Sequence, residues 1–130
     1  MIAVIDYGAG NLASISNGLR KVGAKVELTD DPKIIKTADA IVLPGVGAFG
    51  NAMEKIQQLK PALVEQVKSG KPFLGVCLGI QLLMYSSDES PDARGLEIFK
   101  GGCSRFQTKL KVPHMGWNTI KKTKEEFRCN

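Results

Sequence analysis

The sequence predicts an α/β fold in which a doubly wound, mostly parallel sheet carries helices on both faces, a flavodoxin-like arrangement. Two observations support this fold class. Short continuous apolar runs, such as residues 2–6 and 40–43, alternate with segments whose apolar residues recur at helical spacing. The 130 residues also suit one domain, so we expect residues 1–130 to form a single domain around one sheet.

The first two expected strands flank one helix. Residues 2–6 form a short apolar run that predicts a strand. Residues 12–22 carry apolar side chains at helical spacing, and Gly23 stands where a helix end favours a left-handed residue. Residues 25–28 then predict a second strand. Strand, helix and strand in this order make the repeating unit of a parallel sheet.

The following segments repeat that order. The Asp-Pro pair at residues 31–32 opens a short helix, and residues 40–43 resemble a buried parallel strand. Helical spacing covers residues 53–59, and a further helix runs from Pro61 to a glycine at position 70. Residues 72–76 predict a fourth strand. These units give the four strands that the fold class requires.

The pattern weakens after residue 85. Residues 86–95 are rich in turn-forming residues. Residues 96–99 and 103–107 predict two short strands, and residues 112–117 predict a loop. This part of the chain shows no internal repeat and no flexible linker.

Composition is that of a globular protein. Hydrophobic residues make up 43% of the chain and charged residues 24%. No apolar run approaches the ~18 residues that a membrane span needs, so we expect no membrane partner. The start of the chain lacks a basic segment and a cleavage site, which predicts a first strand rather than a signal peptide and a cytoplasmic location.

The cysteines and the distribution of charge argue against disulfide-rich, zinc-binding and nucleic-acid-binding proteins. Cys77, Cys103 and Cys129 lack paired spacing, so we expect reduced thiols, no zinc site and no cofactor. The net charge of +5 comes from residues 104–130, which hold seven basic side chains against two acidic ones. With few aromatic residues among them, a solvated terminal segment is favoured over a nucleic-acid surface.

A cysteine at the end of the fourth strand is the main catalytic candidate. Cys77 lies between Gly75 and Gly79, and helical spacing resumes directly after it. This is the pattern of a nucleophile elbow, in which side chains at the flanking positions would collide with strand or helix. The helix start favours the thiolate, and the Leu78 amide is placed to stabilise an oxyanion. The alternative is a structural cysteine that packs as a small hydrophobe.

A glycine-rich loop follows the third strand. Residues 44–50 (PGVGAFG) end a neighbouring strand, so their backbone can turn an amide toward the same centre. The second oxyanion donor is then the amide of Val46 or of Gly47. The alternative is a tight turn without chemistry.

The motif at residues 75–81 (GVCLGIQ) resembles the nucleophile motif of class I glutamine amidotransferases. Residues 6–12 (DYGAGNL) and 113–118 (PHMGWN) narrow the resemblance to the glutaminase subunits of imidazole glycerol phosphate synthases. Residues 44–47 (PGVG) also fit, where other amidotransferases usually have Pro-Gly-Gly. The resemblance covers nearly the whole chain, from Met1 to Ile120.

The resemblance implies an activity and a partner. Cys77 would attack the amide of glutamine, and the glutamyl thioester would be hydrolysed. Gln81 and Gly45 match positions that hold glutamine. The ammonia would pass to a separate cyclase subunit, a TIM barrel that forms a heterodimer with the glutaminase in histidine biosynthesis. Asn11 and Trp117 match positions near that interface, although Trp117 could instead be an ordinary core aromatic.

One part of the family pattern is missing. Cysteine acyl transfer needs a base, which the family supplies as a His-x-Glu motif near its C-terminus. The single histidine, His114, is followed by Met115 and Gly116, so we do not assign it that role. We therefore expect an incomplete domain with its C-terminal part missing. Such a chain would be poorly stable, expose an apolar patch or an unpaired strand edge, and lack glutaminase activity alone.

Other interpretations remain open at this point. A truncated domain could dock on the cyclase without making ammonia, and another class I amidotransferase could feed pyridoxal phosphate or nucleotide synthesis. Residues 8–13 (GAGNLA) also match a dinucleotide-binding fingerprint, with Glu27 at the end of the next strand. That interpretation leaves the cysteine elbow unexplained.

Overall fold

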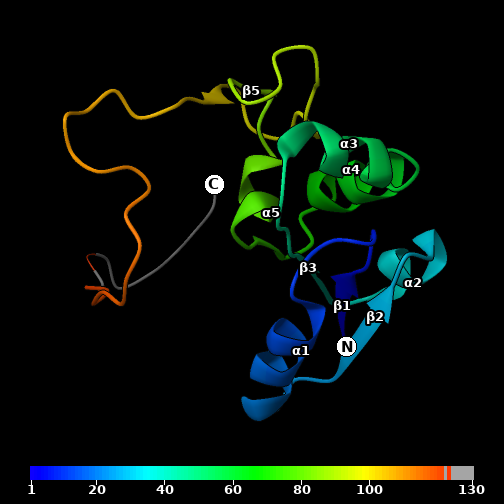
Figure 1. Ribbon diagram of the computed structural model, residues 1–130. Helices are drawn as coiled ribbons and strands as arrows, with labels where there is room; N and C mark the ends of the chain where they lie inside the picture. The colour runs from blue at the N-terminus through cyan, green and yellow to red at the C-terminus, as the bar shows by residue number, and fades with distance from the viewer. Residues whose placement is uncertain (122, 124–130) are drawn as a thin grey trace.

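Four parallel strands form the central sheet of the computed structural model, which describes residues 1–121 and 123 (Figure 1). The strands are β1 (Ile2–Ile5), β2 (Val26–Thr29), β3 (Ala40–Leu43) and β4 (Phe73–Gly75). Their order is β2-β1-β3-β4, so β1 and β3 are the inner strands and β4 is an edge. The four predicted strands and their parallel pairing are confirmed.

Several helices begin and end at residues whose chemistry favours a helix start or a helix end. They are α1 (Leu12–Lys21), α2 (Pro32–Thr37), α3 (Phe49–Ile56), α4 (Lys60–Lys68) and α5 (Leu78–Gln81). The Asp31 carboxylate caps α2 by accepting a hydrogen bond from the Lys33 amide at 2.8 Å. Gly23 and Gly70 follow helix ends with φ of +88° and +83°, as the left-handed positions require.

One face of the sheet is fully covered. Alternate residues of the inner strands, among them Ala3, Ile5, Ile41 and Leu43, join one hydrophobic cluster with side chains from α2, α3 and α4. Ile35, Phe49, Ile56 and Leu63 supply the fully buried helix side chains of this cluster. We call this side of the sheet the covered face.

The opposite side, which we call the open face, carries the row Leu28, Val4, Val42 and Leu74 across all four strands. Val4 and Val42 are buried in the middle of this row, whereas Leu28 is 43% exposed and Leu74 is 54% exposed. Helix α1 contacts β2 but contributes no side chain to the cluster on the covered face. The sheet therefore has helices on both sides, as predicted, and β4 presents the expected unpaired edge with an exposed apolar side chain.

The region after α5 differs from the prediction. Residues 96–99 are not a strand, because the amides of Leu96 and Ile98 bond to carbonyls of Leu82 and Leu83 in the turn after α5. Glu97 also has φ of +59°, which breaks an extended run. The second expected strand shrinks to β6 (Gly102–Cys103), which pairs in parallel with β5 (Ser86–Ser87). No helix among the described residues is long and apolar enough to span a bilayer.

Candidate active site

The corner at Cys77 is the conformational outlier of the sheet. Cys77 joins β4 to α5 with φ of 56° and ψ of −120°, a region that costs a non-glycine residue about 1–3 kcal/mol. The residue is exposed at the carboxyl end of its strand. Such strain at an exposed thiol fits the predicted nucleophile elbow and not a buried structural cysteine. Helix α5 is shorter than expected, because the Leu83 and Met84 amides bond three residues back and close it as a turn.

The two flanking glycines leave no room for a side chain. A Cβ on Gly75 would lie 2.7 Å from the Ile80 Cα, and one on Gly79 would lie 1.9 Å from the Leu43 carbonyl oxygen. Both contacts are with backbone that cannot yield without moving strand or helix. The collisions that the sequence pattern predicts for a side chain are thus present at both positions. Because both residues are glycines, the corner can pack directly against the end of β3.

The loop after β3 lies against this corner. A Cβ on the buried Gly45 would meet the Gly79 amide nitrogen at 2.7 Å and the Leu78 Cβ at 2.8 Å. Val46 and Gly47 follow as exposed residues, and Gly47 has φ of +97°. The structure therefore brings Cys77, Leu78 and Gly45 together, with Val46 and Gly47 at the rim of the same loop. Within the described residues, the Leu78 amide donates no backbone hydrogen bond.

Both ends of this loop are held by residues that the sequence analysis missed. At its start, the Tyr7 hydroxyl donates a hydrogen bond to the Pro44 carbonyl at 2.9 Å. At its end, the amides of Phe49 and Gly50 donate to the Glu89 carboxylate and the Ser90 hydroxyl at 3.0 and 3.1 Å. The available signals were a tyrosine at the end of a buried strand, whose hydroxyl needs a partner, and the inability of Ala48 to cap α3.

The environment of Tyr7 is electrostatically coupled to the corner. Burial, followed by the negative charge of a Cys77 thiolate, raises the pKa of Tyr7 to about 12. The phenol is therefore neutral at physiological pH and can donate its proton in a hydrogen bond. Tyr7 also belongs to the hydrophobic cluster of the covered face.

A cavity of about 390 Å³ borders Gln81. Residues Ser87, Asp88, Glu89, Cys103, Ser104 and Arg105 complete its lining. Burial, followed by the negative charge of Asp88, raises the pKa of the Cys103 thiol, so this second cysteine is less readily ionised than an ordinary thiol. Gln81, the position predicted to hold glutamine, is the one residue of α5 that lines this cavity.

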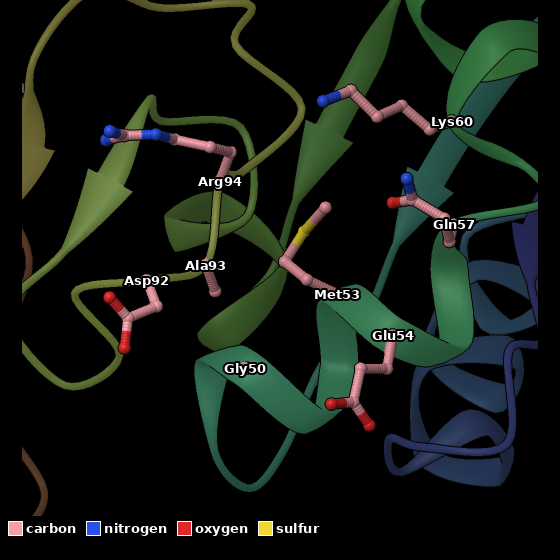
Figure 2. Close-up of a pocket in the computed structure, with 8 residues that line it drawn as sticks. All are labelled: Gly50, Met53, Glu54, Gln57, Lys60, Asp92, Ala93 and Arg94. Carbon is pink, nitrogen blue, oxygen red and sulfur yellow. The ribbon is translucent and has the colours of Figure 1, made fainter.

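A larger cavity of about 570 Å³ lies elsewhere, between α3 and residues 92–94 (Figure 2). None of the predicted site residues lines it. Its cations are already engaged, since the Lys60 ammonium donates to Gly95 and Glu97 and the Arg94 guanidinium lies 4.5 Å from the Tyr85 ring centre. We place the candidate site at the Cys77 corner because backbone strain and a close backbone approach meet there, beside the amides of Val46 and Gly47, which form no backbone hydrogen bond among the described residues.

Two sequence-predicted residues, Asn11 and Trp117, lie outside this centre. Asn11 caps α1 by accepting a hydrogen bond from the Ser14 amide at 3.2 Å, and its side chain is exposed. Trp117 is fully exposed, so the core-aromatic alternative is wrong. His114 is also exposed, in the segment after β6 that runs away from the sheet and helices (yellow to orange in Figure 1). Cys129 falls outside the described residues.

The described residues offer no cluster of three His, Cys, Asp or Glu side chains that could hold a metal ion. The glycine fingerprint after β1 does not build a nucleotide site either. Glu27 lies in the middle of β2, paired with Ala3, and not at the strand end where a ribose would be bound. The carboxyl ends of β1, β3 and β4 instead converge on the loop and corner just described.

Comparisons with known proteins find a family and several relatives that match most of the chain. The family described as glutamine amidotransferase class-I matches residues 3–128. The chain is 54% identical, over 92% of its length and 61% of the relative, to imidazole glycerol phosphate synthase subunit HisH of Methanothermobacter thermautotrophicus. Subunits of the same name from Methanopyrus kandleri and Thermococcus kodakarensis are 45% and 48% identical, over 98% and 96% of the chain and 64% and 61% of those proteins. The chain thus spans about three-fifths of the length of these relatives.

The fold has a solved counterpart. A crystal structure of a glutamine amidotransferase superposes with a TM-score of 0.65 at 15% identity, over 75% of this chain and 53% of that one. This likeness concerns the fold alone, and it confirms the predicted parallel sheet with helices. The sequence match over nearly all residues disfavours the dinucleotide-binding interpretation. The chain belongs to the class I glutamine amidotransferase family.

Proposed function

We propose that this chain provides the glutaminase site of an imidazole glycerol phosphate synthase, releasing ammonia from glutamine for histidine biosynthesis. The observation that carries the proposal is the strained, exposed Cys77 at a corner whose flanking glycines admit no side chain. Similarity to HisH subunits supports the choice of this pathway over other amidotransferases. The name imidazole glycerol phosphate synthase belongs to those relatives, and the proposal that this chain serves the same enzyme rests on its similarity to them.

The proposed chemistry is acyl transfer through a thioester. The Cys77 sulfur attacks the side-chain carbonyl carbon of glutamine, and the carbonyl oxygen gains negative charge. The carbon–nitrogen bond then breaks, and the nitrogen takes a proton and leaves as ammonia. Water hydrolyses the glutamyl thioester to glutamate and restores the thiol. Glutamine and water are thus converted to glutamate and ammonia.

Backbone amides would stabilise the oxyanion. The Leu78 amide follows the nucleophile directly, and the second donor is the amide of Val46 or Gly47 in the facing loop. Gly45 keeps that loop in contact with Gly79, so the donors and the thiol share one small region. Gln81, at the border of the 390 Å³ cavity, and Gly45 would hold the substrate.

The ammonia would pass to a cyclase subunit. We propose that this partner is a TIM barrel, that the pair forms a heterodimer, and that the exposed Asn11 and Trp117 lie near the contact. The solvent exposure of both side chains is compatible with that role. The relatives are described as subunits, which supports the existence of a partner.

The 130 residues supply a nucleophile without a recognisable base. Their one histidine, His114, lies in the exposed segment after β6 and lacks a glutamate two residues later. We therefore expect no measurable ammonia release from glutamine by these 130 residues alone. Ammonia release that Cys77→Ala abolishes would contradict this expectation.

The glutamine site itself can be tested without turnover. A chloroketone analogue of glutamine forms a sulfur–carbon bond with a thiolate and expels chloride, so it needs the nucleophile and the substrate pocket only. At about pH 8 we expect it to label Cys77 at least tenfold faster than chloroacetone does, read by peptide mass spectrometry. Cys103, with its raised pKa, is the internal control and should react slowly with both reagents.

Two further arms complete the test. Free glutamine should protect Cys77 from the chloroketone, and Cys77→Ala should leave the chain unlabelled at this position. Equal labelling by both chloroketones, or labelling of Cys103 at the rate of Cys77, would refute the proposed glutamine site.

A further inference from the structure

Tyr7 lies where the ends of two strands meet the nucleophile corner. It lies two residues after the end of β1, is buried, and its hydroxyl donates a hydrogen bond to the Pro44 carbonyl at 2.9 Å. Pro44 follows β3 and opens the loop that carries Val46 and Gly47. A proline nitrogen carries no hydrogen, so its carbonyl is the one backbone group through which the residue can be held. The phenol therefore holds the loop at its first peptide plane.

The same hydroxyl reaches the nucleophile side of the contact. A Cβ on Gly45 would lie 2.9 Å from the Tyr7 oxygen, 2.8 Å from the Leu78 Cβ and 2.7 Å from the Gly79 amide nitrogen. The phenol oxygen, the loop backbone and the start of α5 thus surround one glycine. Any movement of the Pro44–Gly45 peptide changes its position relative to the Leu78 amide.

The rest of the loop lacks comparable support. Glu89 and Ser90 hold the amides of Phe49 and Gly50 at its far end. Between the two anchors, Val46 and Gly47 are exposed, and among the described residues no backbone hydrogen bond holds the amide of either one. The orientation of these amides therefore depends on how firmly the loop ends are fixed.

We propose that Tyr7 is a positioning residue of the glutaminase site, which fixes the Pro44 peptide plane and thereby aligns the loop amide that faces the Leu78 amide across the reacting carbonyl. The inference rests on the proposed function, because it assigns a role within the same site. Tyr7 does not touch the substrate. It acts through the loop, and its neighbour Cys77 is close enough for the thiolate to raise the phenol pKa.

The test compares two reagents on the same thiol in the 130-residue chain. The chloroketone analogue of glutamine places negative charge on its carbonyl oxygen when the thiolate adds, so its reaction depends on oxyanion donors. Iodoacetamide is attacked at a saturated carbon and expels iodide without forming an oxyanion. The ratio of the two labelling rates at Cys77 therefore reports donor alignment and cancels changes in thiol ionisation.

Tyr7→Phe keeps the ring and removes the hydroxyl. We expect the chloroketone rate at Cys77 to fall about tenfold relative to the iodoacetamide rate. The maximal rate at saturating chloroketone should fall, and the chloroketone concentration that gives half of that rate should stay the same. Tyr85→Phe is the matched control, since it removes the hydroxyl of a partly exposed tyrosine, and should change the ratio less than about twofold. Para-aminophenylalanine at position 7, whose amine donates from the same place, should restore the ratio.

The possible results distinguish failure of the proposed glutaminase function from failure of the proposed role of Tyr7. If the wild-type chain does not prefer the glutamine chloroketone over chloroacetone, the proposed function fails and takes this inference with it. If the preference is present and Tyr7→Phe leaves the reagent ratio unchanged, the positioning role alone is wrong. Equal losses with both reagents, or loss of the folded circular dichroism in Tyr7→Phe, would also overturn it, because the hydroxyl would then serve the fold and not the loop.

Discussion

The two faces of the sheet differ in how completely they are packed. On the covered face, Ile5, Ile41 and Leu43 are at most 1% exposed beneath three helices. On the open face, the central Val4 and Val42 are buried, yet Leu28 and Leu74 at the two edges stay about half exposed. The inner strands β1 and β3 are apolar on both faces, as expected for parallel strands buried on both sides. The alternation of side chains along a strand therefore determines which residues must be buried on each face. It does not provide the helices that bury them.

The catalytic candidate lies on the well-packed side of this comparison. Leu78 and Tyr7 belong to the cluster of the covered face, and the Leu43 carbonyl abuts Gly79. A strained backbone at Cys77 persists only where the surrounding packing over-determines it. The site thus draws on the covered face for its geometry, and damage to that face should be far more costly than damage to the open one.

A matched pair of leucines gives the largest expected effect. Leu43→Ala should lower the free energy of unfolding by about 3 kcal/mol, because it empties a fully buried site. Leu74→Ala, on the open face, should cost less than about 1 kcal/mol. Urea unfolding of the two variants measures the difference. Similar losses at both positions would show that the open face is as well covered as the other.

The next effect is a loss of stability at alkaline pH that depends on Tyr7. Its pKa is raised from 10.0 to about 12 in the folded chain, so the folded state holds this proton more tightly than the unfolded state. The stabilisation is complete below about pH 10 and is lost as pH rises through 12. Between pH 9 and 11.5 the free energy of unfolding should fall by about 2 kcal/mol more in wild type than in Tyr7→Phe. Parallel curves for the two chains would contradict this assignment.

On α1, outside the covered face, a substitution should instead stabilise the chain. The Ser16 hydroxyl is buried and finds no hydrogen-bond partner among the described residues. Ser16→Ala removes this unpaired group and improves helix propensity, so the free energy of unfolding should rise by about 1 kcal/mol. Thermal unfolding followed by circular dichroism checks it, with Ser14→Ala at an exposed position of the same helix as control. A lower melting temperature for Ser16→Ala would reveal a partner for the hydroxyl.

The smallest effect is expected two residues later. Gly18 lies inside α1, and a Cβ there would meet no atom within 4 Å. Gly18→Ala should therefore stabilise the chain by about 0.5 kcal/mol through the lower entropy of the unfolded state. Gly23→Ala, at φ of +88°, should do the opposite. If both changes acted in the same direction, backbone conformation would not explain either.

Local chemistry made most of the sheet and the corner predictable from sequence. The apolar runs of β1 and β3 and the cap at Asp31 depend on neighbouring residues, as does the pair of glycines around Cys77. Each signal lies within a few positions of the feature it predicts. For the loop after β3, strand order and glycine content left an oxyanion donor and a plain turn open, and the resemblance to class I amidotransferases then favoured the donor.

The missed features all involve distant partners. The hydrogen bonds from Tyr7 to Pro44 and from the α3 amides to Glu89 and Ser90 join segments far apart in the chain. Residues 96–99 are apolar enough for a strand, but their amides bond to the turn after α5 and leave none for a ladder. A periodic pattern records burial, and it does not record which carbonyl an amide will reach.

The order of the strands also has a consequence for synthesis. Within these residues β1 is made before the other strands, yet it is an inner strand that pairs with β2 on one side and with β3 on the other. No hairpin can close early in an all-parallel sheet, and every pairing must wait for a crossover helix. The side of β1 that faces β3 therefore remains unpaired until β3 has been made, a delay of a few seconds at ~10 residues per second. During that interval this side of β1 is an open strand edge, the kind of surface with which foreign strands pair.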